Sequence, residues 1–119
     1  MTKPISRPAH GFTDYPYIAA ASIAPTALGF QDEPNAVLMT RVLAGMILVS
    51  SILTRAEWGF VRVMPYRTHL ILDTLGGMTA LASPWLFGFA HNRQARNTFL
   101  ALGLFGLGAG LLSEPEEMP

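Results

Sequence analysis

The chain contains no cysteine and carries few charges. The absence of cysteine excludes disulfide bonds, thiolate metal sites and cysteine nucleophiles, and it leaves the redox compartment open. Only 13% of the 119 residues are charged, against about 25% in an ordinary soluble domain. The eight basic and eight acidic residues cancel, so no surplus charge indicates nucleic acid or a cationic partner. The polar first ten residues lack the apolar core of a removable signal peptide, and we expect none.

The common enzyme signatures are missing as well. The sequence holds no phosphate-binding glycine loop, no GxSxG and no HExxH. Its serines lie in apolar segments without a neighbouring base that could activate a nucleophile. We therefore predict that the protein is not an enzyme, that it has no catalytic residues and that it needs no cofactor.

Long apolar segments are what the chain does have. A membrane-spanning helix needs about 20 mostly apolar residues to cross a hydrocarbon core about 30 Å thick. The last segment is apolar or small all round, which is typical of a deep core helix or a membrane span. A chain of this size cannot bury several such helices away from water. We predict an all-α, integral membrane four-helix bundle with spans at about 12–29, 35–54, 67–88 and 95–113, of which the first is marginal by hydropathy.

The chain also repeats itself. Shifting it by 59 positions (69 minus 10) without a gap superposes rare residue types on one another: His10 on His69, Asp14 on Asp73, Pro25 on Pro84, Gly29 on Gly88 and Phe30 on Phe89. Each half then contains two spans, so the chain returns to its starting side and the halves share one orientation, related by a pseudo-twofold axis along the membrane normal. This parallel arrangement predicts a polar segment (1–9), repeat 1 (10–54), a cytoplasmic loop (55–66), repeat 2 (67–113) and an acidic tail (114–119).

The second repeat carries a recognisable motif. Its stretch THLILDTLGGMTALASPWLFGF resembles the SPW-repeat family of small bacterial integral membrane proteins, whose members carry one or two copies of a two-helix unit with a Ser-Pro-Trp signature. Ser83-Pro84-Trp85 is complete, whereas the first copy, Ala24-Pro25-Thr26, lacks the serine and the tryptophan. The resemblance covers about residues 10–113. It implies the membrane topology and a bacterial inner membrane, and it supplies no active site.

The motif is interpreted as a device that ends a helix at the membrane surface. A proline in the last turn removes one N–H donor, and a tryptophan suits the headgroup level. A following glycine can adopt the left-handed turn that closes the helix, with the next apolar residue folding back. The predicted helix-exit residues are Pro25, Gly29, Phe30, Ser83, Pro84, Trp85, Gly88 and Phe89.

Basic residues favour one orientation. Lysine and arginine near span ends mark the cytoplasmic face. Five of them lie on the side of the termini, and two, or three with Arg41, lie on the side of the short loops, which favours cytoplasmic N- and C-termini. The five are Lys3, Arg7, Arg55, Arg62 and Arg67, and the others are Arg93, Arg96 and Arg41, which is about one and a half turns into the second span.

Two pairs of ionisable residues are the candidates for chemistry. His10 and Asp14, like His69 and Asp73, are spaced i, i+4, which puts each pair on one helix face. If the two faces meet, two imidazoles and two carboxylates converge and could bind a divalent metal or pass a proton. The alternative is structural: each pair satisfies itself near the interface, within reach of water and headgroups, with the carboxylate close to the positive helix end. We favour the structural interpretation at this stage.

Glycines in the last segment predict close helix packing. Gly103, Gly106 and Gly110 include the GxxxG spacing that lets backbones approach within a membrane. They fit packing inside the bundle or against another subunit.

The leading functional hypothesis is a structural, accessory or scaffolding role, for example as a subunit of a larger membrane complex. The expected partners are membrane lipids and other membrane subunits or a second copy, and not nucleic acid. One alternative is a metal- or cofactor-binding membrane protein that uses the two His/Asp pairs. A small transporter or channel is disfavoured, because Arg41 is the one charge that approaches the midplane.

Overall fold

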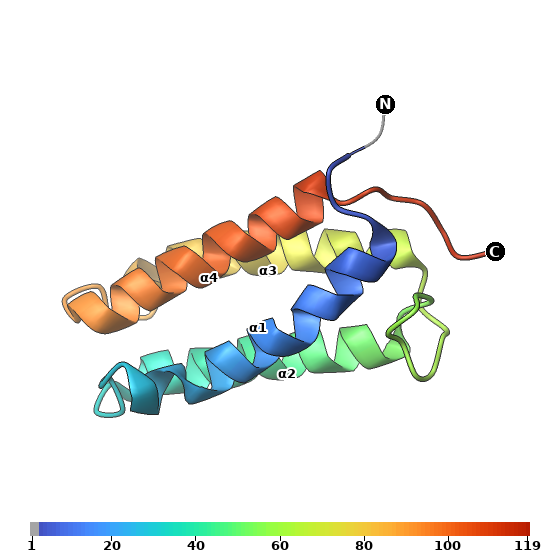
Figure 1. The fold of residues 1–119 in the computed structure, drawn as a ribbon. Helices are drawn as coiled ribbons and strands as arrows, with labels where there is room; N and C mark the ends of the chain where they lie inside the picture. The colour runs from blue at the N-terminus through green and yellow to red at the C-terminus, as the bar shows by residue number, and fades with distance from the viewer. Residues whose placement is uncertain (1–2) are drawn as a thin grey trace.

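The structure, a computed structural model, describes residues 3–119 and contains four helices. These are α1 (Arg7–Ala27), α2 (Pro34–Leu53), α3 (Tyr66–Leu86) and α4 (Arg93–Leu112). Figure 1 shows two hairpins, α1–α2 and α3–α4, that point the same way. Both termini and the 54–65 connection lie at one end of the molecule, called the terminal end below, and the two short connections lie at the other. The predicted all-α arrangement of two helix hairpins is confirmed.

The repeat governs every helix boundary. Each helix of the second hairpin begins and ends 59 residues after its counterpart (66 minus 7, 86 minus 27, 93 minus 34 and 112 minus 53). The relation extends to the terminal end, where Ile5 pairs with Ser113 and Met64 pairs with Thr54 as isolated parallel bridges. Ile5, just before the first hairpin, therefore pairs with the residue that follows the second hairpin. Met64, just before the second hairpin, pairs with the residue that follows the first.

The first helix begins at Arg7, earlier than the expected start near residue 12. Ser6 is its N-cap, and the Ser6 side chain accepts a hydrogen bond of 3.3 Å from the Ala9 backbone N–H. Pro8 lies in the first turn, where its missing N–H costs nothing. The earlier start places His10 and Asp14 inside the helix rather than at its edge. The other boundaries lie within about two residues of the expected ones.

Both helix exits use the same turn. Gly29 and Gly88 have φ values of 74° and 75°, a left-handed conformation that favours glycine. The next residue folds back in each case. The Phe89 N–H donates to Pro84 O at 2.9 Å, as the equivalent Phe30 N–H does in the first hairpin, and both phenylalanines are fully buried. The turn thus closes the helix and delivers one aromatic ring to the core.

The three signature residues point in different directions. Pro84 and Ser83 are buried, and the Ser83 hydroxyl donates to the Thr79 carbonyl at 2.6 Å. Trp85, by contrast, is 61% exposed on the outside of the molecule. Serine and proline therefore belong to the packing, whereas the indole faces the surroundings.

Small residues bring α3 and α4 together. A Cβ placed on Gly103 would lie 2.9 Å from Gly77 O, and one on Gly110 would collide with the Thr74 hydroxyl. A Cβ on Gly106 would lie 3.5 Å from the Gly77 Cα, which is ordinary contact. The structure thus places all three predicted packing glycines against α3 in their own hairpin.

Many apolar side chains point outward. Helices α2 and α4 are long and apolar enough to cross a membrane, yet only 39% and 33% of their most apolar 18-residue windows are buried. The core helix of a soluble protein would be mostly buried. Two apolar helices with outward-facing side chains suggest membrane association. Helices α1 and α3, which carry the His/Asp pairs, do not meet the same criterion.

The main core is shared by all four helices and lies between the hairpins. A smaller cluster lies beside the 54–65 connection at the terminal end: Ala56, Tyr66 and Leu70. The main core is made by Tyr17, Ala24, Phe30, Ala36, Leu43, Ile47, Ala80, Phe89, Ala95 and Phe99.

Candidate functional site

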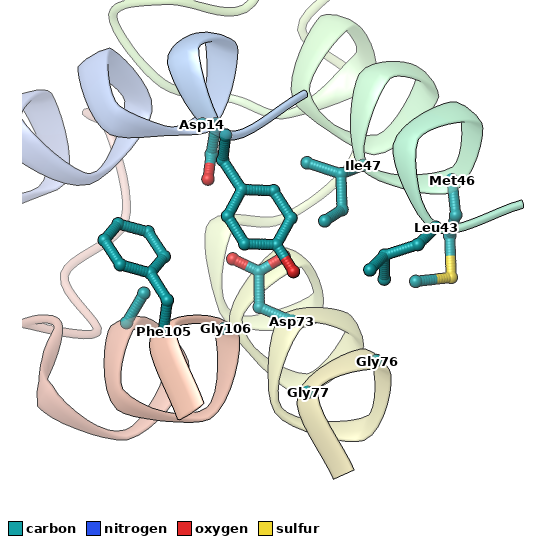
Figure 2. Close-up of a pocket in the computed structure, with 11 residues that line it drawn as sticks. Asp14, Leu43, Met46, Ile47, Asp73, Gly76, Gly77, Phe105 and Gly106 are labelled. Carbon is teal, nitrogen blue, oxygen red and sulfur yellow. The ribbon is translucent and has the colours of Figure 1, made fainter. Parts of the chain in front are cut away.

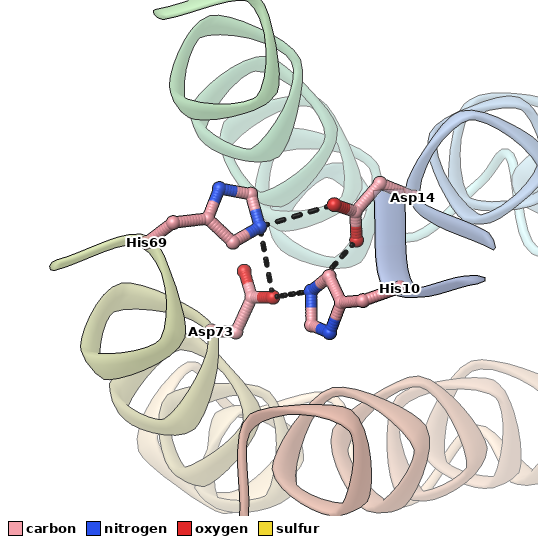
Figure 3. A group of neighbouring side chains, drawn as sticks. All are labelled: His10, Asp14, His69 and Asp73. Carbon is pink, nitrogen blue, oxygen red and sulfur yellow. Dashed lines mark hydrogen bonds and ion pairs between the residues drawn. The ribbon is translucent and has the colours of Figure 1, made fainter. Parts of the chain in front are cut away.

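The two His/Asp pairs meet between the hairpins, at the terminal end (Figure 3). His10 Nε2 lies 2.6 Å from Asp73 Oδ2 and 3.3 Å from Asp14 Oδ1. His69 Nε2 lies 3.0 Å from Asp14 Oδ2 and 3.1 Å from Asp73 Oδ2. Each imidazole therefore contacts carboxylates of both repeats, and the shortest contact joins α1 to α3. We call these four residues the His/Asp cluster.

The cluster is buried. His10 and His69 are 0% and 1% exposed, and the two carboxylates are 7% and 5% exposed. The expectation that these residues lie within reach of water and headgroups is wrong. Two features account for the burial: α1 starts earlier than expected, and the Tyr66 ring covers both imidazoles, edge-on to His10 at 5.9 Å and stacked on His69 at 6.3 Å.

Each imidazole is also held by a hydroxyl group from the other repeat. His10 Nδ1 lies 2.6 Å from Ser113 Oγ, and His69 Nδ1 lies 2.9 Å from Thr54 Oγ1. Thr54 and Ser113 end α2 and α4 and are themselves 59 positions apart (113 minus 54). Sequence reasoning missed both hydroxyls. The repeat offset was the signal that could have found them, although one residue is a threonine and the other a serine.

These hydroxyls set the tautomer of the histidines. The Ser113 hydroxyl donates to Ala109 O and the Thr54 hydroxyl donates to Ser50 O, one turn back in each helix. Because the hydroxyl hydrogen is already used, its oxygen accepts from the imidazole, which assigns the hydrogen to Nδ1. His10 Nε2 also lies 2.6 Å from Asp73 Oδ2, and it donates there because a carboxylate only accepts, so the His10 ring carries a hydrogen on both nitrogens. Loss of the Nε2 hydrogens would leave both Nε2 atoms facing the carboxylates as ligand atoms.

The site contains unused hydrogen-bonding capacity. Among residues 3–119, the two buried side-chain polar atoms without a hydrogen bond are His69 Nε2 and Tyr66 OH. His69 Nε2 is close to two carboxylate oxygens, but neither lies in line for a hydrogen bond. Since the large majority of buried polar atoms have partners, two orphans at one site mark it as unusual.

Two small cavities flank the cluster. Figure 2 shows Asp14 and Asp73, from two different helices, among the residues that line the first, which has a volume of about 10 Å³ and is otherwise lined mainly by apolar residues. The second, also about 10 Å³, lies between His10, His69 and Trp58. Each has room for about one water-sized sphere. The space suits a single small ligand and is too small for an organic cofactor.

Ion pairs and the acidic tail close the terminal end. Arg7 and Glu57 form a salt bridge of 2.9 Å, and this hydrogen bond lowers the pKa of the Glu57 carboxyl below its ordinary value. Burial acts to raise the pKa of Glu117, but backbone N–H bonds from Arg67 and Tyr66 outweigh it, so that pKa is lowered. Those bonds, 3.0 and 2.8 Å long, cap the start of α3. The tail is thereby fastened beside the cluster.

A known protein family matches most of the chain. The model of the SPW repeat domain matches residues 10–113. The chain belongs to the SPW repeat family. The matched region begins at His10 and ends at Ser113, so the whole cluster and its two hydroxyl partners lie inside the SPW repeats. Comparisons with the curated proteins and with the solved structures gave no match.

The SPW signature and the His/Asp cluster occupy opposite ends of α3. Ser83, Pro84 and Trp85 lie in the last turn, whereas His69 and Asp73 lie in the first two turns. The signature that defines the repeat therefore serves the helix exit, and the polar cluster is a separate feature of the same repeat.

Proposed function

We propose that this SPW repeat protein is an integral membrane protein with four membrane-spanning helices and cytoplasmic termini. The observation that carries the proposal is the outward exposure of large apolar side chains along all four helices. Their exposed fractions would be costly in water and are expected against lipid tails. Examples are Ile23 (61%), Leu38 (59%), Val49 (57%), Ile71 (59%) and Leu104 (63%).

Within the membrane, the protein has an accessory or scaffolding role and no catalysis of its own. Two of its grooves support this role, because both are open and almost wholly apolar. One, of about 600 Å³, lies between α1 and α4 beside Phe12 and Phe105. The other, of about 270 Å³, lies between α2 and α3 beside Met39 and Leu75. Such surfaces suit lipid chains or the helices of another subunit.

Co-purification tests the accessory role. The full chain, solubilised in mild detergent from its own membrane, is expected to elute with a second membrane subunit or as an oligomer of itself. Isolation of a clean monomer under several mild detergents would contradict the role. The same membranes washed with alkaline carbonate should retain the chain if it is integral.

A second candidate function is binding of a metal ion at the His/Asp cluster. The observation that favours it is the convergence of four ligand-type atoms, which lie within 4.8 Å of one another. Elemental analysis of the detergent-purified chain, after incubation with divalent ions and desalting, tests it. The two functions are compatible, because a bound ion would stabilise the fold of a protein that acts as a scaffold.

A further inference from the structure

We propose that the His/Asp cluster binds one divalent first-row transition ion, with Zn²⁺ as the best match, and that this ion fastens the two hairpins together. The proposal deepens the candidate metal-binding function and rests on it. It names the class of ion and gives the ion a structural task.

The ligand set selects the class of ion. Two imidazole nitrogens and two carboxylate oxygens form a mixed nitrogen and oxygen set, which suits Zn²⁺ and its neighbours. Mg²⁺ and Ca²⁺ prefer oxygen ligands, six or more in number, and the buried cluster does not supply them. Four protein ligands without an open position correspond to a structural zinc site.

The ligand atoms converge without yet having tetrahedral spacing. Zinc bonds of 2.0–2.1 Å separate every pair of ligand atoms by about 3.3 Å. The four contacts between imidazole nitrogens and carboxylate oxygens measure 2.6, 3.0, 3.1 and 3.3 Å and involve both oxygens of Asp14. With one ligand atom from each residue, the set lies within 4.8 Å. Seating the ion therefore requires the short contacts to open by a few tenths of an ångström and the most distant ligand atoms to approach one another. The adjacent cavities of about 10 Å³ leave room for that movement.

Charge balance permits a divalent ion. Asp14 and Asp73 bring two negative charges into a site that is almost closed to water. Two protonated imidazoles can balance these charges, and so can one divalent cation with two neutral imidazoles, which makes the ion an exchange for two protons at unchanged net charge.

The outer contacts are arranged as for a metal ligand. In metal sites, a ligating histidine usually donates its other ring N–H to a fixed acceptor, which orients the ring. Thr54 and Ser113 provide that acceptor for His69 and His10. The orphaned Nε2 of His69 is an independent observation, since its position facing two carboxylates without an in-line partner is the position of a ligand atom.

The ion would add a bond between the hairpins, beside the hydrophobic core that they share. Helix α1 packs mainly on α2, and α3 packs mainly on α4, so direct contacts between hairpins are fewer than contacts within them. Each hairpin contributes one histidine and one aspartate to the cluster. A single ion therefore bonds to both hairpins at once.

Binding is tested on the full chain in detergent, stripped of metal. Isothermal titration with Zn²⁺, Co²⁺, Mg²⁺ and Ca²⁺, together with elemental analysis, should give one Zn²⁺ or Co²⁺ per chain and no binding of the other two at the same concentrations. The visible spectrum of the Co²⁺ form should show the intense bands of tetrahedral coordination. Absence of both Zn²⁺ and Co²⁺ binding would overturn the candidate function and the proposal together, whereas preference for Mg²⁺ or Ca²⁺ would overturn the class of ion alone.

Substitutions locate the site. Thr54→Val keeps all four ligands and removes one orienting hydroxyl, so the affinity for Zn²⁺ should fall by about 10–100-fold. His69→Ala should abolish Zn²⁺ binding. If that variant does not fold, the Zn²⁺ affinity of Thr54→Val still tests the location of the site. The matched control is His91→Gln, which breaks a His–Glu33 contact of 2.8 Å at the other end of the molecule. Equal losses in Thr54→Val and His91→Gln would contradict the assignment.

The proposed fastening of the two hairpins is tested by measuring the distance between them. Thermal unfolding would not test it, because any ligand that binds the folded state raises the stability of the protein. The chain has no cysteine, so spin labels can be placed at Ala9→Cys and Thr68→Cys, exposed positions on α1 and α3. Zn²⁺ should narrow the distance distribution between these hairpins. A control pair within one hairpin, Thr68→Cys and Leu111→Cys, should not change. Zn²⁺ binding that leaves the first pair unchanged would overturn the fastening role and leave the metal site intact.

Discussion

Individual side chains at the terminal end divide into two classes with different energetic weight. Those of the His/Asp cluster are buried and contact each other across the repeats, so each depends on the rest. Those outside it, such as Arg7 and Glu57, form ion pairs that solvent screens. The buried cluster determines what the site can bind, whereas the ion pairs make a small contribution to the stability of the terminal end.

The Arg7–Glu57 pair predicts a modest acid sensitivity. Because the folded-state pKa of Glu57 is lowered, its contribution is present at neutral pH and is lost as the pH falls from the ordinary value of 4.5 through the folded pKa. The exposed setting limits the effect to at most about 1 kcal/mol. The measurement is the thermal midpoint in detergent against pH for the natural chain and for Glu57→Gln. The two curves should converge at acid pH; a constant gap would contradict the pair.

Elements are joined in two ways, by close backbone approach within the second hairpin and by the paired turns that end α1 and α3. Gly103 faces Gly77 across the α3–α4 contact, whereas a Cβ on Gly108 would meet nothing within 4 Å. A glycine is therefore required for packing at Gly103 but not at Gly108, although both lie on α4.

Gly103→Ala should destabilise the hairpin, and Gly108→Ala should not. The added methyl at Gly103 would press on the Leu81 side chain at 2.6 Å and on backbone, which costs about 1–3 kcal/mol. At Gly108 the methyl is free, and alanine's higher helix propensity applies. Thermal unfolding in detergent provides the comparison, and equal midpoints for the two variants would refute the packing role of Gly103.

Trp85 is expected to act as an anchor for the end of α3. Its indole is 61% exposed, so Trp85→Ala removes little packing and removes the group suited to the headgroup level. The amount of chain in the membrane fraction should fall several-fold, because losses of about 1–2 kcal/mol change abundance by that much. Leu86→Ala, at a neighbouring residue that is 67% exposed, is the control. Unchanged abundance and stability in Trp85→Ala would defeat the anchor interpretation.

At the scale of the whole molecule, the distribution of basic residues predicts an orientation for the proposed membrane topology. Lys3, Arg55, Arg62 and Arg67 lie at the end that holds both termini and the 54–65 connection. The short connections at the other end are followed by Arg93 and Arg96. For the proposed membrane topology, the excess of basic residues predicts that the terminal end, and with it the His/Asp cluster, lies on the cytoplasmic side.

Cysteine labelling checks this orientation. A single introduced thiol reports the side on which it lies, because the natural chain has none. In intact cells, a thiol reagent that cannot cross the membrane should label Gln31→Cys in a short connection and spare Val61→Cys in the 54–65 connection. Both positions are exposed, so access within the protein does not differ. The reverse pattern would invert the orientation, and labelling of both would contradict a membrane between them.

Much of the fold could be predicted because its signals are local and are used twice. Apolar length indicated the helices, and the offset of 59 indicated that the hairpins share a direction. The start of α1 was misplaced because Ser6 and Pro8 begin a helix in a stretch that is polar. For the site, the spacing of His10 and Asp14 placed them on one face, but it could not show that Asp73 would be the nearer carboxylate to His10.

The sequence by itself determined the helix order and the helix exits at Gly29 and Gly88, because these depend on neighbours within a turn or two. It also determined the twofold repetition and the identity of the four polar residues, because both can be read from the sequence at the offset of 59. Only the tertiary structure decided that these four residues meet, that they are buried and that Thr54 and Ser113 orient the histidines. The physical reason is that the rotation and tilt of one hairpin against the other depend on packing across the whole interface. No spacing within either repeat contains that information.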